Sequence, residues 1–131
     1  MYKLISNSDS KNNPVFITPW SLIHFLTGVV GIINSNYFNI NKNVSLFFLF
    51  LIHTLYELKD YYFSYVYNGS KNIISEWASS NSIFNTIGDT LFFVLGMIIS
   101  ININVNKNQL IIVNVFFLLI CLIFFTNKNL R

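Results

Sequence analysis

The chain has 131 residues, of which 53% are hydrophobic and only 10% are charged. Soluble domains carry roughly one quarter charged residues, so this composition excludes an ordinary soluble domain. The net charge of +3 comes without a basic run, so no nucleic-acid partner is expected. The single cysteine, Cys121, excludes a disulfide framework and a CxxC metal site.

The pattern of apolar segments predicts an all-α integral membrane bundle of four transmembrane helices. Residues 1–16 are polar and are expected to be an N-terminal tail. Thr18-Pro19 then starts the first helix, with Thr as N-cap and Pro in the first turn. The transmembrane domain spans 17–126, and a basic tail follows at 127–131. Its helices are expected at about 17–34, 44–66, 82–101 and 109–126.

The sequence also predicts a short helix at the membrane surface and close packing between the spans. Ile73, Ile74 and Trp77 share one helical face within the segment 71–80, which predicts a short helix in the membrane interface between the second and third spans. The glycines of the spans are expected to allow close helix packing; they are Gly28, Gly31 and Gly96.

Orientation follows from the distribution of basic residues. Six of them lie in the N-tail, the second loop and the C-tail: Lys3, Lys11, Lys59, Lys71, Lys128 and Arg131. The first and third loops carry only Lys42 and Lys107. Because basic residues concentrate in cytoplasmic loops, both termini are predicted to be cytoplasmic.

Polar residues occur in three of the four spans, and this orientation places them in one leaflet. They are His24, His53, Glu57, Asp60, Asn85 and Asp89. At 1.5 Å rise per residue, they fall roughly 5–15 Å below the cytoplasmic boundary. A carboxylate inside a membrane helix costs several kcal/mol, so it normally faces a partner, a cavity or a site.

Such a cluster permits two kinds of chemistry. His53 and Glu57 are four residues apart, so both can point at one centre that His24 and Asp89 complete, forming a ligand set for Zn²⁺, Mn²⁺ or Fe²⁺. Without metal, Glu57 and Asp89 could act as an acid/base pair. Asn81 and Asn85 could hydrogen-bond a lipid headgroup or the ligands themselves.

Three stretches resemble VanZ-like membrane proteins and, more closely, a related family of uncharacterised small bacterial membrane proteins. They are Thr18-Pro19-Trp20-Ser21-Leu22-Ile23-His24, Tyr56-Glu57-Leu58-Lys59-Asp60 and Asn81-Ser82-Ile83-Phe84-Asn85-Thr86-Ile87-Gly88-Asp89. The resemblance implies that His24, Glu57, Asp60, Ser82, Asn85 and Asp89 occupy motif positions. Ser21 stands where that pattern has a His, Asn81 where it has an Asp, and Tyr56 where it has a Trp. The related family carries no settled activity that could be transferred.

Three functions stay open at this point. The first is a membrane protein whose polar cluster binds a metal or a lipid headgroup, with or without catalysis by Glu57 or Asp89; Asn81, Ser82, Asn85 and Asp60 would contact the headgroup. The second is a structural or assembly protein whose cluster only fixes helix packing. A proton-coupled carrier is a weaker third, because the polar residues do not line a path through both leaflets.

Overall fold

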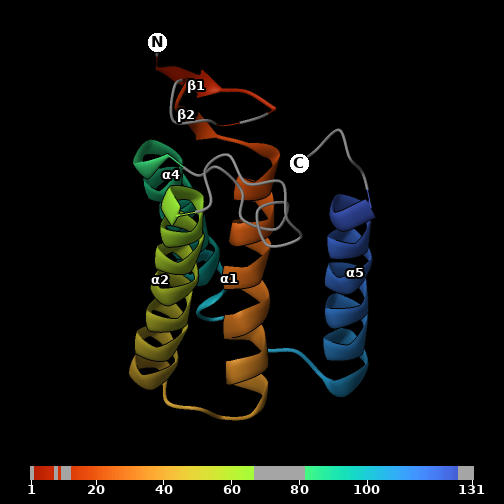
Figure 1. The fold of residues 1–131 in the computed structure, drawn as a ribbon. Coiled ribbons are helices and arrows are strands. Elements are labelled where there is room, and N and C mark those ends of the chain that lie inside the picture. The colour runs from red at the N-terminus through yellow and green to blue at the C-terminus, as the bar shows by residue number, and fades with distance from the viewer. Residues whose placement is uncertain (1, 8, 10–12, 67–81, 127–131) are drawn as a thin grey trace.

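The computed structural model describes residues 2–7, 9, 13–66 and 82–126. Within these residues the chain is all-α apart from one small sheet, which confirms the predicted class. The helices are α1 (Pro19–Tyr37), α2 (Lys42–Val66), α4 (Ile83–Ser100) and α5 (Lys107–Thr126), and the strands are β1 (Lys3–Ile5) and β2 (Val15–Ile17) (Figure 1). The predicted interfacial helix at 71–80 lies outside the described residues.

The two helices α1 and α4 form the centre of the bundle and cross backbone against backbone. A Cβ added at Gly28 would lie 2.3 Å from the carbonyl oxygen of Phe93, and one at Gly96 would lie 2.1 Å from that of Phe25. Glycine permits this approach because it has no side chain. The predicted packing role is therefore confirmed for Gly28 and Gly96. Beside the crossing lies the core cluster of Ile32, Phe93 and Met97.

The helix α2 packs against α1 and α4 less extensively than those two pack against each other. Near its start, Leu46 and Leu49 pack against the core cluster. Over residues 42–62, where burial is described, the buried side chains of α2 are all polar: Ser45, His53, Glu57 and Asp60. Many other apolar side chains of α2 are exposed, among them Phe47, Phe48, Ile52 and Leu55.

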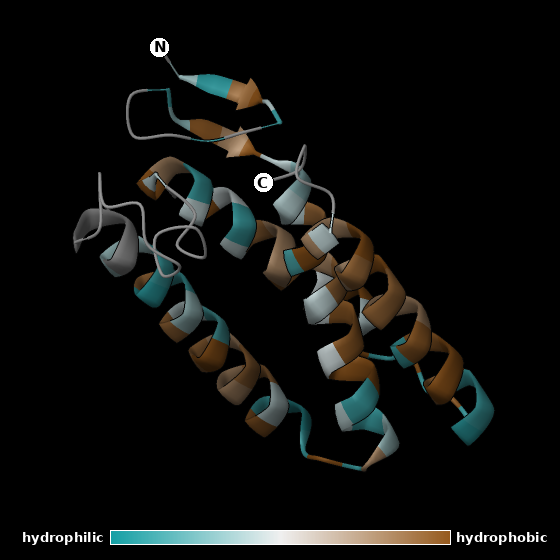
Figure 2. Cartoon of the chain, turned by 45° about the vertical axis from the view of Figure 1, so that its right-hand side comes forward, coloured by the Kyte–Doolittle hydropathy of each residue, from teal (hydrophilic) through white to brown (hydrophobic). Residues whose placement is uncertain are grey.

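The helix α5 lies to one side and packs chiefly against α1 (Figure 1). At one end, Trp20 of α1 contacts Phe124 and Phe125. At the other, the side-chain amides of Asn34 and Asn114 donate to each other at 3.2 and 3.3 Å. The helix thus runs antiparallel to α1, and most of its surface is apolar and exposed (Figure 2).

The segment expected to be a polar N-terminal tail carries two short strands in its described residues. Strands β1 and β2 pair in parallel, with Lys3 opposite Val15, and Val15 is buried. The carboxylate of Asp9 accepts hydrogen bonds from the backbone N–H of Val15 at 2.7 Å and of Ser82 at 2.5 Å. This segment supplies an acceptor for the start of α4, a partner distant in sequence that local polarity does not reveal.

The first helix also extends beyond its predicted end, because its asparagines make helical and interhelical hydrogen bonds. Asn34 donates to the carbonyl oxygen of Val30 at 2.8 Å, and Asn36 donates to that of Ile103 at 2.9 Å. Asn34 is the last residue of the predicted span 17–34, and Asn36 lies beyond it. Through these asparagines, α1 is hydrogen-bonded to α5 and to the residues after α4 at the end of the bundle opposite the sheet.

Two of the four described helices, α4 and α5, are long and apolar enough to cross a membrane. Helices α1 and α2 do not meet the same test. Polar residues interrupt them, most visibly along α2, whereas α5 is hydrophobic over most of its length (Figure 2). The length and composition of the helices therefore support membrane association without establishing four spans.

Candidate metal centre

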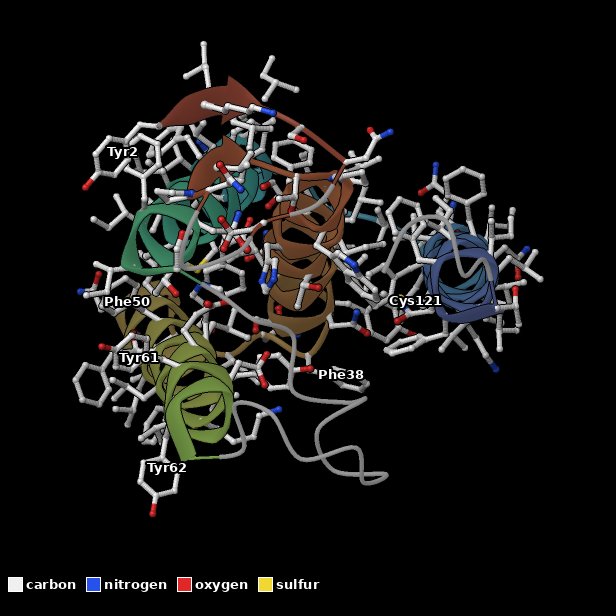
Figure 3. All side chains as sticks on the ribbon, turned by 45° about the horizontal axis from the view of Figure 1, so that its top comes forward. Tyr2, Phe38, Phe50, Tyr61, Tyr62 and Cys121 are labelled. Carbon is white, nitrogen blue, oxygen red and sulfur yellow. The ribbon has the colours of Figure 1, made fainter. Side chains whose placement is uncertain are left out.

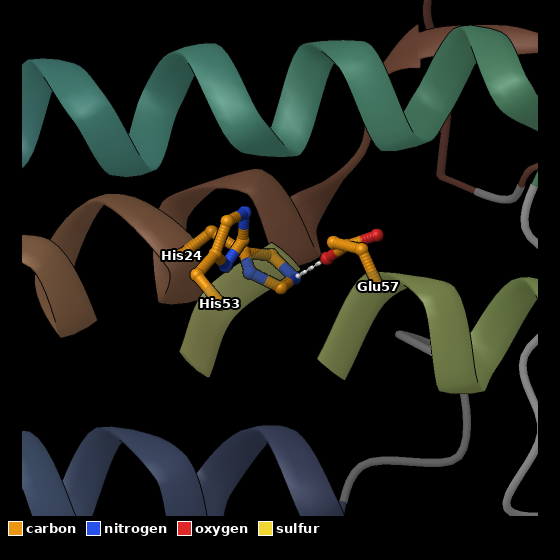
Figure 4. A group of neighbouring side chains, drawn as sticks. All are labelled: His24, His53 and Glu57. Atoms are coloured by element: carbon orange, nitrogen blue, oxygen red, sulfur yellow. Dashed lines mark ion pairs between the residues drawn. The ribbon is translucent and has the colours of Figure 1, made fainter. Parts of the chain in front are cut away.

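Side chains from three helices meet near the end of the bundle that carries the sheet. His24 of α1 and His53 and Glu57 of α2 each offer a ligand atom, and these atoms all lie within 4.8 Å of one another (Figure 4). His24 Nε2 lies 3.4 Å from Glu57 Oε1 and 3.7 Å from Oδ2 of Asp89 on α4. All four residues of the predicted ligand set therefore lie together.

The cluster is enclosed. Glu57 and Asp89 are 2% and 1% exposed, His53 is 5% exposed, and the side chain of His24 is 14% exposed. Groups of this polarity cost free energy when buried unless they have partners. Glu57 on α2 and Asp89 on α4 both approach His24 on α1, at 3.4 and 3.7 Å.

The ring of His53 is held in place by α4. It stacks on Phe93 with centroids 4.2 Å apart and planes 7° from parallel, and its Nε2 lies 3.3 Å from Thr90 Oγ1. The His24 ring meets the His53 ring edge-on at 5.1 Å. The sequence predicts His53 as a ligand only from its spacing of four residues to Glu57. In the structure, that spacing turns both side chains toward the same interior point.

Asp89 is oriented by Ser21, a residue that the sequence did not indicate. The Ser21 hydroxyl donates to Asp89 Oδ1 and accepts from the backbone N–H of Thr18 at 3.1 Å. Ser21 is fully buried, one turn before His24 on the same face of α1. In the sequence, Ser21 is distinguished only by standing where the pattern of the resembling family has a His.

The spacing of the donor atoms can be compared with that of a metal site. Ligands at about 2.0–2.1 Å from Zn²⁺ in tetrahedral arrangement lie about 3.3 Å from one another. The His24–Glu57 separation of 3.4 Å and the His24–Asp89 separation of 3.7 Å are close to this value. The ligand atoms of both histidines and Glu57 all lie within 4.8 Å of one another. The donor set and its spacing are compatible with a bound metal ion.

The remaining predicted site residues do not join this centre. Ser82 is the N-cap of α4: its hydroxyl accepts from the Asn85 backbone N–H at 3.2 Å and donates to Asp9 at 3.0 Å. Asn85 directs its amide toward the carbonyl oxygen of Phe16. These side chains serve the packing of the sheet on α4 instead of presenting donors to a headgroup.

Asp60 and Asn81 complete the predicted set. Asp60 is buried, and its carboxylate pairs with Lys59 Nζ at 2.7 Å. The Lys59 ammonium also lies 3.7 Å from the centroid of the Tyr56 ring. Asn81 lies outside the described residues. Cys121 lies on α5, the helix that takes no part in the cluster (Figure 3).

Comparison with known proteins gave no match to any family model, curated protein or solved structure. The chemistry of the cluster must therefore be argued from its own residues. Two imidazoles and two carboxylates in a buried centre suit a first-row transition metal.

Proposed function

We propose that this chain is a multi-pass membrane protein that binds a divalent transition-metal ion, such as Zn²⁺, through His24, His53 and Glu57. The observation that carries the proposal is the convergence of their ligand atoms within 4.8 Å. Asp89 Oδ2 is the candidate fourth donor, because it lies 3.7 Å from His24 Nε2. Ser21 would fix the Asp89 carboxylate, as hydrogen-bonding partners commonly do for metal ligands.

The distribution of side chains around α2 supports a four-span arrangement. This helix buries His53 and Glu57 and exposes Phe48 and Ile52. A helix in water would do the opposite, whereas polar groups of a membrane helix face the bundle interior. The proposed topology has α1, α2, α4 and α5 all crossing the bilayer, with both termini cytoplasmic and the cluster in the cytoplasmic leaflet.

The burial of the donor side chains favours a structural metal ion over a catalytic one. Catalytic zinc sites keep one position open to water and substrate. Here the Asp89 carboxylate is available as a fourth donor, and both Glu57 and Asp89 are almost fully buried. In this proposal Glu57 is a ligand and not an acid/base catalyst, and the centre stabilises or regulates the bundle.

Elemental analysis of the protein, purified in nanodiscs after equilibration with Zn²⁺, tests the proposal. One equivalent of zinc per chain is expected for the unaltered protein, and His53→Ala and Glu57→Gln should lose it. The matched control is Thr54→Val, because the Thr54 hydroxyl donates only to the Phe50 carbonyl oxygen of its own helix. A folded, unaltered protein that retains no zinc would overturn the metal proposal.

A second candidate function is a structural or assembly protein in which the same residues only fix helix packing. The position of His24 between Glu57 and Asp89 favours it, because a histidine between two carboxylates on other helices links all three. The two candidates differ in the same experiment. A packing network leaves the zinc content at background in the unaltered protein and in every variant.

A further inference from the structure

The two halves of α2 are attached to the bundle in different ways. In the first half, Leu46 and Leu49 pack against the apolar core cluster, and Leu49 also covers Gly31. From His53 onward, the buried described side chains are polar: His53, Glu57 and Asp60. The apolar side chains of this second half, such as Leu55 and Leu58, face outward.

This division matters because apolar side chains gain little by leaving lipid for a helix interface. Helix association in a bilayer depends on close packing and polar contacts. The first half of α2 has the close contacts, and the second half has the polar ones. Among these polar groups, the ligand atoms of His53 and Glu57 lie close to that of His24 on α1.

We propose that metal binding controls the docking of the second half of α2 against α1 and α4. This inference rests on the proposed metal site. α2 supplies two of the ligands, α1 supplies His24, and α4 supplies Asp89. Because these ligands come from three helices, a bound ion ties the second half of α2 to α1 and α4. Without the ion, the second half of α2 moves away while Leu46 and Leu49 hold the first half.

Distances between spin labels measure this movement. In a Cys121→Ser background, Leu58→Cys on α2 and Leu91→Cys on α4 carry one label pair, since both side chains are exposed. Phe47→Cys and Ile98→Cys, also exposed, carry a reference pair across the first half of α2. Zn²⁺ has a filled d shell and no redox chemistry, so it does not broaden the label signal.

Electron–electron distance measurements in nanodiscs, with a chelator or with Zn²⁺, give the result. A broad Leu58–Leu91 distribution with chelator should become one narrow, shorter distribution with Zn²⁺, while the Phe47–Ile98 pair stays unchanged. Adding Glu57→Gln should keep the first distribution broad in zinc, with the reference pair showing that the fold persists. Stoichiometric zinc binding with an unchanged Leu58–Leu91 distribution would overturn this inference and leave the metal site standing. Absence of zinc binding would overturn both.

Discussion

His24 Nε2 lies 3.4 Å from Glu57 Oε1, and this contact joins α1 to the polar side of α2. The same nitrogen lies 3.7 Å from Asp89 on α4. One imidazole therefore stands at the meeting point of three helices. Whether an ion binds at this point decides between a metal centre and a packing network.

The Ser21–Asp89 hydrogen bond predicts an effect on metal affinity. Ser21→Ala should weaken zinc binding by about 10–100-fold, as loss of a partner that orients a metal ligand commonly does. The matched control is Ser35→Ala on the same helix, whose hydroxyl donates only to the Gly31 carbonyl oxygen. Competition titration with a zinc chelator measures both variants. Equal affinity in the two would place Asp89 outside the site.

The approach of α4 to β2 predicts that Gly88 tolerates no side chain. An added Cβ would lie 1.9 Å from the Phe16 carbonyl oxygen, which belongs to the backbone and has little room to move. Gly88→Ala should lower the free energy of unfolding by about 1–3 kcal/mol. Gly31→Ala is the control, because its Cβ would meet only the flexible end of Leu49. Denaturation in matched detergent should show the larger loss at Gly88.

The hydrogen bonds of Asp9 to Ser82 predict coupled stability effects. Ser82→Ala removes the N-cap of α4 and should cost about 1 kcal/mol. Asp9→Ala removes the partner of the same serine, so the double variant should cost less than the sum of the two single ones. Asn7→Ala, at an exposed residue of the same segment, is the control. Strict additivity in thermal unfolding would show that the Asp9 carboxylate does not interact with Ser82.

The proposed four-span topology predicts which loops face the same side. Phe38 after α1 and Ile103 after α4 are both exposed. In a Cys121→Ser background, Phe38→Cys and Ile103→Cys should react with an impermeant maleimide from the same side of the membrane, and Tyr2→Cys from the other. If only α4 and α5 cross, Phe38→Cys will react from the side opposite to Ile103→Cys.

The all-α class and the grouping of the polar residues could be predicted because both depend on short-range periodicity. His53 and Glu57 share a helical face whatever surrounds them, and the helix start at Thr18-Pro19 is a local signal. Asp9 and Ser21 could not be predicted in the same way. Their partners, Ser82 and Asp89, lie far along the chain, and nothing local distinguishes them from solvated polar residues.

Ser82 and Asn85 are the opposite case: the sequence predicts them at the site, but their side chains serve the fold. The sequence predicts both near a headgroup, Asn85 from the helical face that it shares with Asp89 and Ser82 from the resemblance. Asp9 and Phe16 of the N-terminal segment, which the sequence did not indicate as partners, accept their hydrogen bonds instead. A polar residue beside a site can therefore serve the fold, and only the three-dimensional arrangement separates the two uses.

The most direct test of the account is X-ray absorption spectroscopy of the zinc-loaded protein. The predicted first shell contains two imidazole nitrogens and carboxylate oxygens at about 2.0–2.1 Å. His24→Ala should remove one imidazole from that shell. A shell of oxygen atoms alone, unchanged by His24→Ala, would contradict a metal centre built from His24, His53 and Glu57.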